Sequence, residues 1–171
     1  MEKNIRITTI ALFVAMAVVL HWTESFIPRP APFLKLGLAN VMTLCTLYAF
    51  GGLWSIFVAV SRVFIASALS GSIFSPAFAF SLFGGLAAGL CMWAMPKSRF
   101  SPIGVSVGGA ATHMAAQAYL ATFIIPHTFL MGILPFFLLV SVLTGMVNGY
   151  LVKIIIETME ERRSALPPHE M

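Results

Sequence analysis

Long apolar runs separated by short polar breaks dominate this 171-residue chain. Six of these runs approach the length of about 20 residues that an α-helix needs to cross a bilayer. They extend over Ile7–Ile27, Leu36–Phe50, Gly52–Ser70, Pro76–Met95, Ile103–Ile125 and Phe129–Ile156. The pattern predicts an all-α, polytopic membrane protein with six transmembrane helices in a single domain, residues 1–156. The segment 157–171 is predicted to be a charged cytoplasmic tail.

Charge is scarce and unevenly placed along the chain. Only 9% of the residues are charged, against roughly 25% in a soluble domain, which makes the lipid bilayer the solvent of this fold. With the N-terminus inside, one side of the six spans collects the basic residues Lys3, Arg6, Lys97, Arg99, Lys153, Arg162 and Arg163. The other side has Arg29 and Lys35, so the positive-inside rule predicts a cell-membrane protein with both termini cytoplasmic. Basic residues placed in this way give no support for a nucleic-acid partner.

Arg62 departs from this distribution, because it lies near the middle of the third apolar run, Gly52–Ser70. An ionised side chain inside a bilayer costs about 3 kcal/mol or more unless it faces the protein interior, a wet cavity or a ligand. We therefore expect Arg62 to belong to a binding site. The alternative is that Arg62 bonds helix carbonyl groups or Glu24 and has a structural role.

The segment from Ile27 to Asn40 (IPRPAPFLKLGLAN) is the most distinctive stretch outside the apolar runs. Its closely spaced prolines favour a stiff, extended chain on the outer side of the membrane. One interpretation is a lid that places Lys35 over a pocket open to the outside. The other interpretation is that the Lys35 side chain extends to the lipid headgroups.

Three polar side chains, those of Asn40, His113 and Gln117, are expected to lie beside Arg62. His113 and Gln117 are four residues apart, so they share one face of the fifth helix. Both lie about ten residues or more from the cytoplasmic end of that helix, which at 1.5 Å per residue places them at or beyond the midplane. Arg62 and Lys35 would neutralise a ligand, Asn40 and Gln117 would orient it, and His113 would accept a bond or respond to pH. The alternative is that these residues only join helices.

The chemistry expected of this pocket is binding. Arg62 with Lys35 favours an anionic group on the ligand, and nearby aromatic residues suit an apolar or planar part. The chain has no aspartate and most of its six glutamates lie at its ends, so carboxylate catalysis and hard-cation sites have little support. It also lacks a GxxxxGK[ST] phosphate-binding loop and metal spacing among its histidines. We expect no cofactor and no metal, and the balance is against an enzyme.

Three segments resemble one family of membrane proteins. They are Pro32-Phe-Leu-Lys-Leu-Gly-Leu-Ala-Asn40, the Arg62 helix ending at Ser70-Gly71, and Phe80-Ser-Leu-Phe-Gly-Gly85. With them the chain is similar, from Ile7 to Lys153, to the Gx transporter family, which is also called heptaprenyl diphosphate synthase component I. That family in turn resembles the substrate-binding S components of energy-coupling-factor (ECF) transporters. The resemblance implies a compact six-helix bundle whose ligand pocket opens outward beneath the first loop.

The resemblance also implies partners. S components dock, through an Ala-xxx-Ala face on the first helix, to a transmembrane coupling protein that two cytoplasmic ATPases drive, and Ala11 and Ala15 match this face. The synthase name implies a soluble prenyl synthase as the partner instead. Because prenyl synthases hold Mg²⁺ through aspartate-rich motifs, a chain without aspartate does not supply their catalytic subunit.

The function we expect is a membrane-embedded, S-component-like transporter subunit that takes up a small anionic or amphipathic molecule from the outer side. Two alternatives stay open. One is a non-catalytic membrane accessory subunit in heptaprenyl diphosphate or quinone biosynthesis, or in flavin-linked electron transfer. The other is a structural assembly factor in which the polar side chains only join helices.

Overall fold

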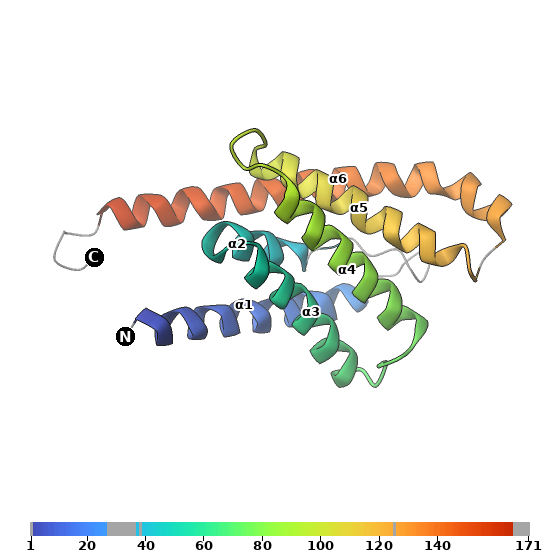
Figure 1. The fold of residues 1–171 in the computed structure, drawn as a ribbon, viewed down its shortest axis with the longest axis horizontal. Coiled ribbons are helices and arrows are strands. Elements are labelled where there is room, and N and C mark those ends of the chain that lie inside the picture. Colours follow the sequence, from blue (N-terminus) through green and yellow to red (C-terminus); the bar gives the residue numbers. More distant parts are fainter. Residues whose placement is uncertain (1, 27–36, 38, 125, 166–171) are drawn as a thin grey trace.

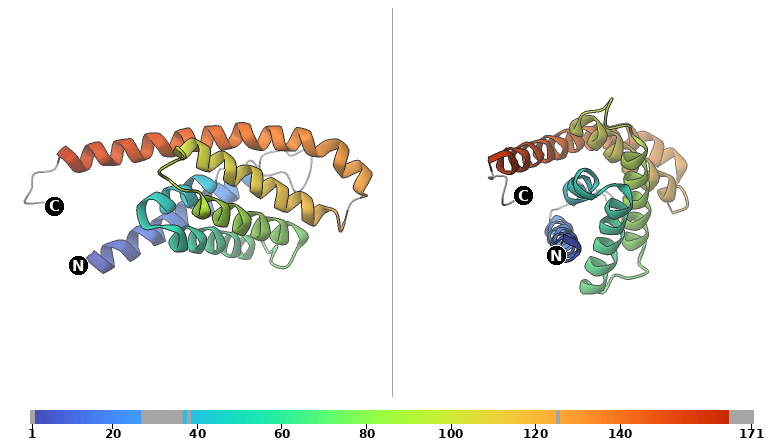
Figure 2. Two further views of the ribbon diagram at one scale, coloured as in Figure 1. Left: turned by 45° about the horizontal axis from the view of Figure 1, so that its top comes forward. Right: turned by 60° about the vertical axis from the view of Figure 1, so that its left-hand side comes forward.

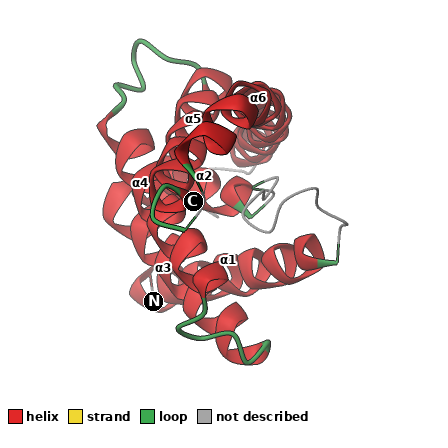
Figure 3. Ribbon diagram, turned by 90° about the vertical axis from the view of Figure 1, so that its right-hand side faces the viewer, coloured by secondary structure: helices red, strands yellow, loops and turns green. Residues whose placement is uncertain are grey.

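A computed structural model of the protein describes residues 2–26, 37, 39–124 and 126–165, and these form six α-helices. The helices are α1 (Glu2–Ser25), α2 (Asn40–Phe50), α3 (Gly52–Leu69), α4 (Pro76–Ala94), α5 (Pro102–Ala121) and α6 (His127–Ala165). No strand occurs among the described residues (Figure 3). Four of the helices, α1, α3, α4 and α6, are long and apolar enough to cross a membrane. The predicted all-α membrane fold is confirmed.

The helix boundaries follow from local sequence signals. α4 and α5 each begin at a Ser-Pro pair, in which the serine hydroxyl accepts a backbone N–H and the proline occupies the first turn. Ser75 Oγ accepts from Phe78 N at 3.2 Å, and Ser101 Oγ accepts from Gly104 N at 3.3 Å. Serine satisfies an N–H group that has no partner within the helix, and proline has no N–H to lose at that position.

Several boundaries differ from those that the apolar pattern predicts. α1 begins at Glu2 instead of Ile7, and α5 ends at Ala121 instead of Ile125. α2 begins at Asn40, whereas the pattern predicts a start at Leu36. Gly37 explains the later start, because its φ of 76° lies outside the range of a right-handed helix. At the other end of the chain, α6 continues past Ile156 to Ala165. The charged segment that begins at residue 157 therefore starts as an extension of the last helix.

Five of the helices form an arc around the remaining one, α2. α1, α3, α4, α5 and α6 pack in this order, each against the next, and α2 lies inside the arc against α1, α3, α4 and α6 (Figure 2). Residues 40–47 of α2 are all buried, as expected of a helix that is enclosed on every side. α2 has only 11 residues, so it fills the middle of the arc without reaching far along it.

The beginning of α1 and the end of α6 lie at the same end of the bundle, which we call the terminal end (Figure 1). The opposite, distal end holds the last turn of α1, the first turn of α2 and the beginning of α6. Termini at one end agree with an even number of crossings. That this end faces the cytoplasm stays a prediction from the distribution of basic residues.

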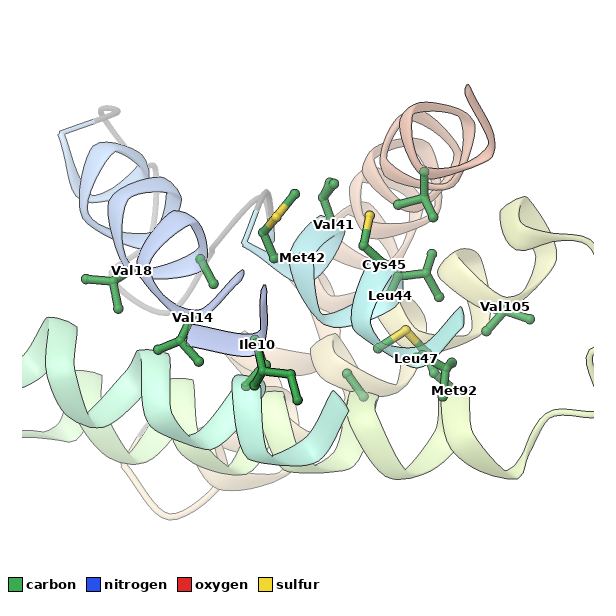
Figure 4. Packing of buried hydrophobic residues seen from close by; sticks show 14 of the residues in the cluster. Ile10, Val14, Val18, Val41, Met42, Leu44, Cys45, Leu47, Met92 and Val105 are labelled. Carbon is green, nitrogen blue, oxygen red and sulfur yellow. The ribbon is translucent and has the colours of Figure 1, made fainter. Parts of the chain in front are cut away.

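The hydrophobic core surrounds α2. Ile10 and Val14 point from α1 toward α3, and the side chains of α2 fill the space between α1 and the helices on the other side of the arc (Figure 4). The buried cluster includes Ile10, Val14, Val18, Val41, Met42, Leu44, Cys45, Leu47, Met92 and Val105. This core fixes α2 along its length and so positions the residues at its distal end.

Two small residues of α6, Gly145 and Gly149, bring α5 and α6 into close contact. A methyl group added at Gly149 would lie 2.5 Å from Ile103 Cα, and one added at Gly145 would lie 2.9 Å from Val107 Cα. The two helix backbones can approach this closely only because α6 has no side chain at these positions.

Candidate functional site

Arg62 lies on the inner face of α3 with 3% of its surface exposed. Its Nη2 donates a hydrogen bond to Asn40 Oδ1 at 2.6 Å. Its Nε is buried and has no hydrogen-bond partner among the described residues. Gly85 of α4 faces the guanidinium group, since a Cβ at this glycine would lie 3.8 Å from Nη2. The structure therefore brings Arg62 and Asn40 together, as the sequence predicts, with donor capacity left over on the arginine.

A small cavity lies beside Arg62, toward the distal end of the bundle. We call it the polar chamber, and it is lined by His21, Glu24, Gly37, Arg62, Ser81 and His113. The lining comes from α1, α3, α4 and α5 and from the glycine that precedes α2. Its volume of about 10 Å³ is room for about one water molecule. The chamber therefore has little free space in this structure.

Glu24 is the second charged residue of the chamber. It lies in the last turn of α1, with 2% of its surface exposed. Its Oε1 accepts a hydrogen bond from Gly37 N at 2.6 Å, and its charge attracts the guanidinium group of Arg62. The sequence indicated Glu24 as an alternative partner for Arg62, and the structure places it in the lining of the same chamber.

Gly37 joins three helices through its own backbone. Its N–H is held by Glu24 of α1, and its carbonyl oxygen accepts from Asn148 Nδ2 of α6 at 3.0 Å and from Asn40 N of α2 at 2.8 Å. Its φ of 76° is left-handed, a conformation that glycine adopts without the penalty of a side chain. We call Glu24, Gly37, Asn40 and Asn148 the glycine clasp. The clasp fixes the position from which Asn40 reaches Arg62.

Asn148 was missed by the sequence analysis. It is buried in α6, with 3% of its surface exposed, and it lies between Gly145 and Gly149 in an apolar run. The signal that could have found it is the one that identified Arg62. A polar side chain within a membrane-spanning helix needs an internal partner, and that of Asn148 is the Gly37 carbonyl group.

His113 and Gln117 both lie on the buried face of α5 but have different neighbours. His113 lines the polar chamber, and Gly84 of α4 makes room for its ring, because a Cβ at this glycine would lie 2.8 Å from the imidazole. Gln117 donates from Nε2 to the carbonyl oxygen of Phe80 in α4 at 3.3 Å. It is not among the residues that line the chamber. Its observed contact joins α5 to α4, and a role in ligand binding stays a prediction.

The remaining predicted residues lie elsewhere. Lys35 falls outside the described residues, and so does the proline-rich segment that was interpreted as a lid. Ala11 and Ala15 are both exposed on α1. A hollow of about 380 Å³ lies between α1, α2 and α6, with Phe13, Phe50 and Met159 in its lining, and neither alanine is among its lining residues.

The polar chamber brings together side chains of several chemical kinds. A guanidinium, a carboxylate, two imidazoles and a hydroxyl group surround it, and they can fix a ligand by charge and hydrogen bonds. Within the described ranges, no group of three or more His, Cys, Asp or Glu side chains is placed to hold a metal ion.

Comparisons with known proteins agree with the fold. The solved structure of the S component of a bacterial ECF transporter superposes with a TM-score of 0.61, at 21% identity over 95% of this chain and 96% of the other. At this identity the likeness is one of fold. No curated protein matches the sequence.

The family resemblance found in the sequence is confirmed directly. The sequence model of the family described as heptaprenyl diphosphate synthase component I matches residues 13–155. The match includes the chamber residues on all four helices and Asn148 of the clasp. This chain is therefore a multi-pass membrane protein that belongs to the heptaprenyl diphosphate synthase component I family.

Proposed function

We propose that this protein is a substrate-binding membrane subunit, like an S component, that takes up a small anionic or amphipathic molecule from the outer side of the membrane. The observation that carries the proposal is Arg62. It is a buried cation inside the membrane-spanning part of the fold, it lines a polar chamber, and its Nε has no hydrogen-bond partner among the described residues.

The energetics of burial support this role for Arg62. A buried guanidinium group that makes few hydrogen bonds lowers the stability of the fold, and such residues in membrane proteins usually mark a binding site or a transport pathway. A carboxylate or phosphate group on a ligand would accept the donors that Arg62 still offers. Because the chamber has a volume of only about 10 Å³, binding requires the surrounding helices to move apart.

The position of the chamber supports uptake from outside. Its lining includes Glu24 in the last turn of α1 and Gly37 just before α2, which belong to the distal end. The positive-inside rule assigns the opposite end to the cytoplasm. The solved S component with the same fold belongs to a transporter.

Loss of a retained ligand on replacing Arg62 tests the site. The protein is released gently from the membrane, and any small molecule that it carries is identified by native mass spectrometry. We expect Arg62→Ala to lower the occupancy of an anionic molecule at least about 30-fold, because truncating one partner of a buried charged pair costs about 2 kcal/mol or more. Arg99→Ala, which removes an exposed arginine from the α4–α5 loop, is the matched control. Equal occupancy in Arg62→Ala and wild type would contradict the assignment.

We propose further that Ala11 and Ala15 form the docking face for a transmembrane coupling protein and its ATPases. Both residues are exposed, and small side chains allow another helix to approach closely.

Bulkier residues at this face should prevent docking. Leucine at both Ala11 and Ala15 is expected to lower co-purification with a co-expressed coupling protein and ATPase pair at least about tenfold, because leucine holds the helices apart. Leucine at Ala68 and Ala115, which are also exposed alanines on other helices, is the control. Docking that survives the first pair of changes would exclude this face.

The family description favours a second candidate, an accessory subunit of a prenyl diphosphate synthase. The chain has no aspartate, so the Mg²⁺-binding motifs of that chemistry would come from the partner. Co-purification of a soluble prenyl synthase with the wild-type protein, in place of a small molecule, would support this candidate.

A further inference from the structure

Gly85 of α4 leaves space beside the buried guanidinium group of Arg62. A Cβ built at this glycine would lie 3.8 Å from Arg62 Nη2 and 3.9 Å from the carbonyl oxygen of Ala59, and no described atom of another helix would lie nearer. Both distances are those of ordinary van der Waals contact. The interior of the bundle therefore has room for a group of the size of a methyl group at this point.

Helix packing does not account for this glycine. At Gly84, the preceding residue, a Cβ would lie 2.8 Å from the ring of His113, and at Gly149 of α6 a Cβ would lie 2.5 Å from Ile103 Cα. Those two glycines allow neighbouring groups to approach closely. At Gly85 an alanine fits without a clash, and alanine is favoured over glycine inside a helix. Gly85 therefore lowers the stability of α4 without a gain in packing.

The groups around this space indicate what it can receive. Gly85 lies four residues after Ser81, which lines the polar chamber, so the two share one face of α4. Arg62 is 3% exposed, its Nε has no hydrogen-bond partner among the described residues, and its Nη2 has a second N–H besides the one that bonds Asn40. An anionic oxygen that accepts from Nη2 at about 2.8 Å on the side of Gly85 would overlap a Cβ at that position. The space therefore suits one such oxygen.

We propose that Gly85 is a specificity-determining residue of this site, because the space that it leaves between α3 and α4 receives one oxygen atom of the ligand's anionic group, bound to Arg62. The inference rests on the proposed function, since it concerns how the same site holds its ligand. It requires a ligand with an unhindered terminal oxygen on its anionic group, as in a carboxylate. A side chain as small as that of alanine would exclude this oxygen and leave the helices in place.

Gly85→Ala tests the inference, because it should stabilise the empty protein and weaken binding at the same time. Propionate is the probe for a carboxylate. Thermal unfolding of the purified, detergent-solubilised protein is measured at constant ionic strength, without propionate and over a range of propionate concentrations. Gly89→Ala is the matched control, since a Cβ at Gly89, one turn further along α4, would contact Ile56 Cγ1 at 3.4 Å and not the guanidinium group. Arg62→Gln removes the cation.

Without propionate, we expect Gly85→Ala to unfold at a temperature about 2 °C higher than wild type, because alanine favours the helix. The same variant should need at least about tenfold more propionate for the same stabilisation, which is the usual effect of one additional carbon atom in a binding pocket. Gly89→Ala should respond to propionate like wild type, and Arg62→Gln should not respond.

Three results would overturn the role of Gly85: an unchanged propionate response in Gly85→Ala, an equal loss of response in Gly89→Ala, or a lower unfolding temperature of Gly85→Ala without propionate. The proposed site stays intact in each case if Arg62→Gln loses the response. A response in Arg62→Gln equal to that of wild type overturns the inference and the proposed function together. Absence of a response in wild type and all variants overturns the inference alone if a retained molecule is still lost from Arg62→Ala.

Discussion

Replacing Asn40 with leucine should lower the free energy of unfolding by about 3 kcal/mol. Asn40 Oδ1 accepts the hydrogen bond that Arg62 donates at 2.6 Å. Leucine would leave that donor in a buried space without an acceptor, and removing one partner of a buried charged group is among the most costly single changes in a protein interior. Asn40 also begins α2, so its loss would loosen the helix at the centre of the arc.

Thr46→Val provides the comparison for this prediction. Thr46 is buried in the same helix, and its hydroxyl donates to Met42 O of that helix at 2.7 Å. Its replacement with valine removes a hydroxyl group that does not contact a charged residue. We expect the free energy of unfolding to fall by about 1 kcal/mol. Equilibrium unfolding in mixed micelles measures both variants. A cost for Asn40→Leu no larger than that for Thr46→Val would mean that Asn40 does not stabilise Arg62.

The second large effect is expected where α5 and α6 touch. Gly149→Val should destabilise the bundle by about 3 kcal/mol, at the upper end of what overpacking costs. A Cβ at this position would lie 2.5 Å from Ile103 Cα and 3.1 Å from Pro102 O. Both atoms belong to the backbone of α5, so relief requires the helices to separate, and separation would move Asn148 away from Gly37.

Gly132→Val in the same helix is the control for this effect. No atom lies within 4 Å of a Cβ built at Gly132, so we expect a change of less than about 1 kcal/mol there. The same unfolding measurement applies, with circular dichroism to verify that the helix content is unchanged before unfolding. A similar loss of unfolding free energy in both variants would show that valine destabilises the α6 helix itself, and that the contact between α5 and α6 is not the cause.

Much of the fold could be predicted because the length of an apolar run and the residues that begin a helix are both local features of the sequence. The third and fourth helices begin at the predicted Gly52 and Pro76. The start of α2 could not be predicted in this way. It depends on the left-handed conformation of Gly37, which is held by side chains of α1 and α6.

The site could be predicted from the sequence only at residues whose burial in a membrane is energetically costly. Arg62 stands out in an apolar run because a buried charge in a membrane protein needs a partner or a function. The predicted neighbour Asn40 is its hydrogen-bond partner. Asn148 was not found, because its partner is a backbone carbonyl group 111 residues away in the sequence. No pattern along the chain reveals such a contact, which depends on how the helices pack.

The glycine clasp has a consequence for how the protein is made. Gly37 leaves the ribosome 111 residues before Asn148, a delay of about 5 to 20 seconds at ordinary rates of synthesis. Throughout that time Gly37 can find Glu24, but the third member of the contact does not yet exist. The clasp is therefore completed only when the last helix enters the membrane. A nascent chain that stops before α6 holds its buried arginine in an unfinished site, and would be a ready substrate for membrane quality control.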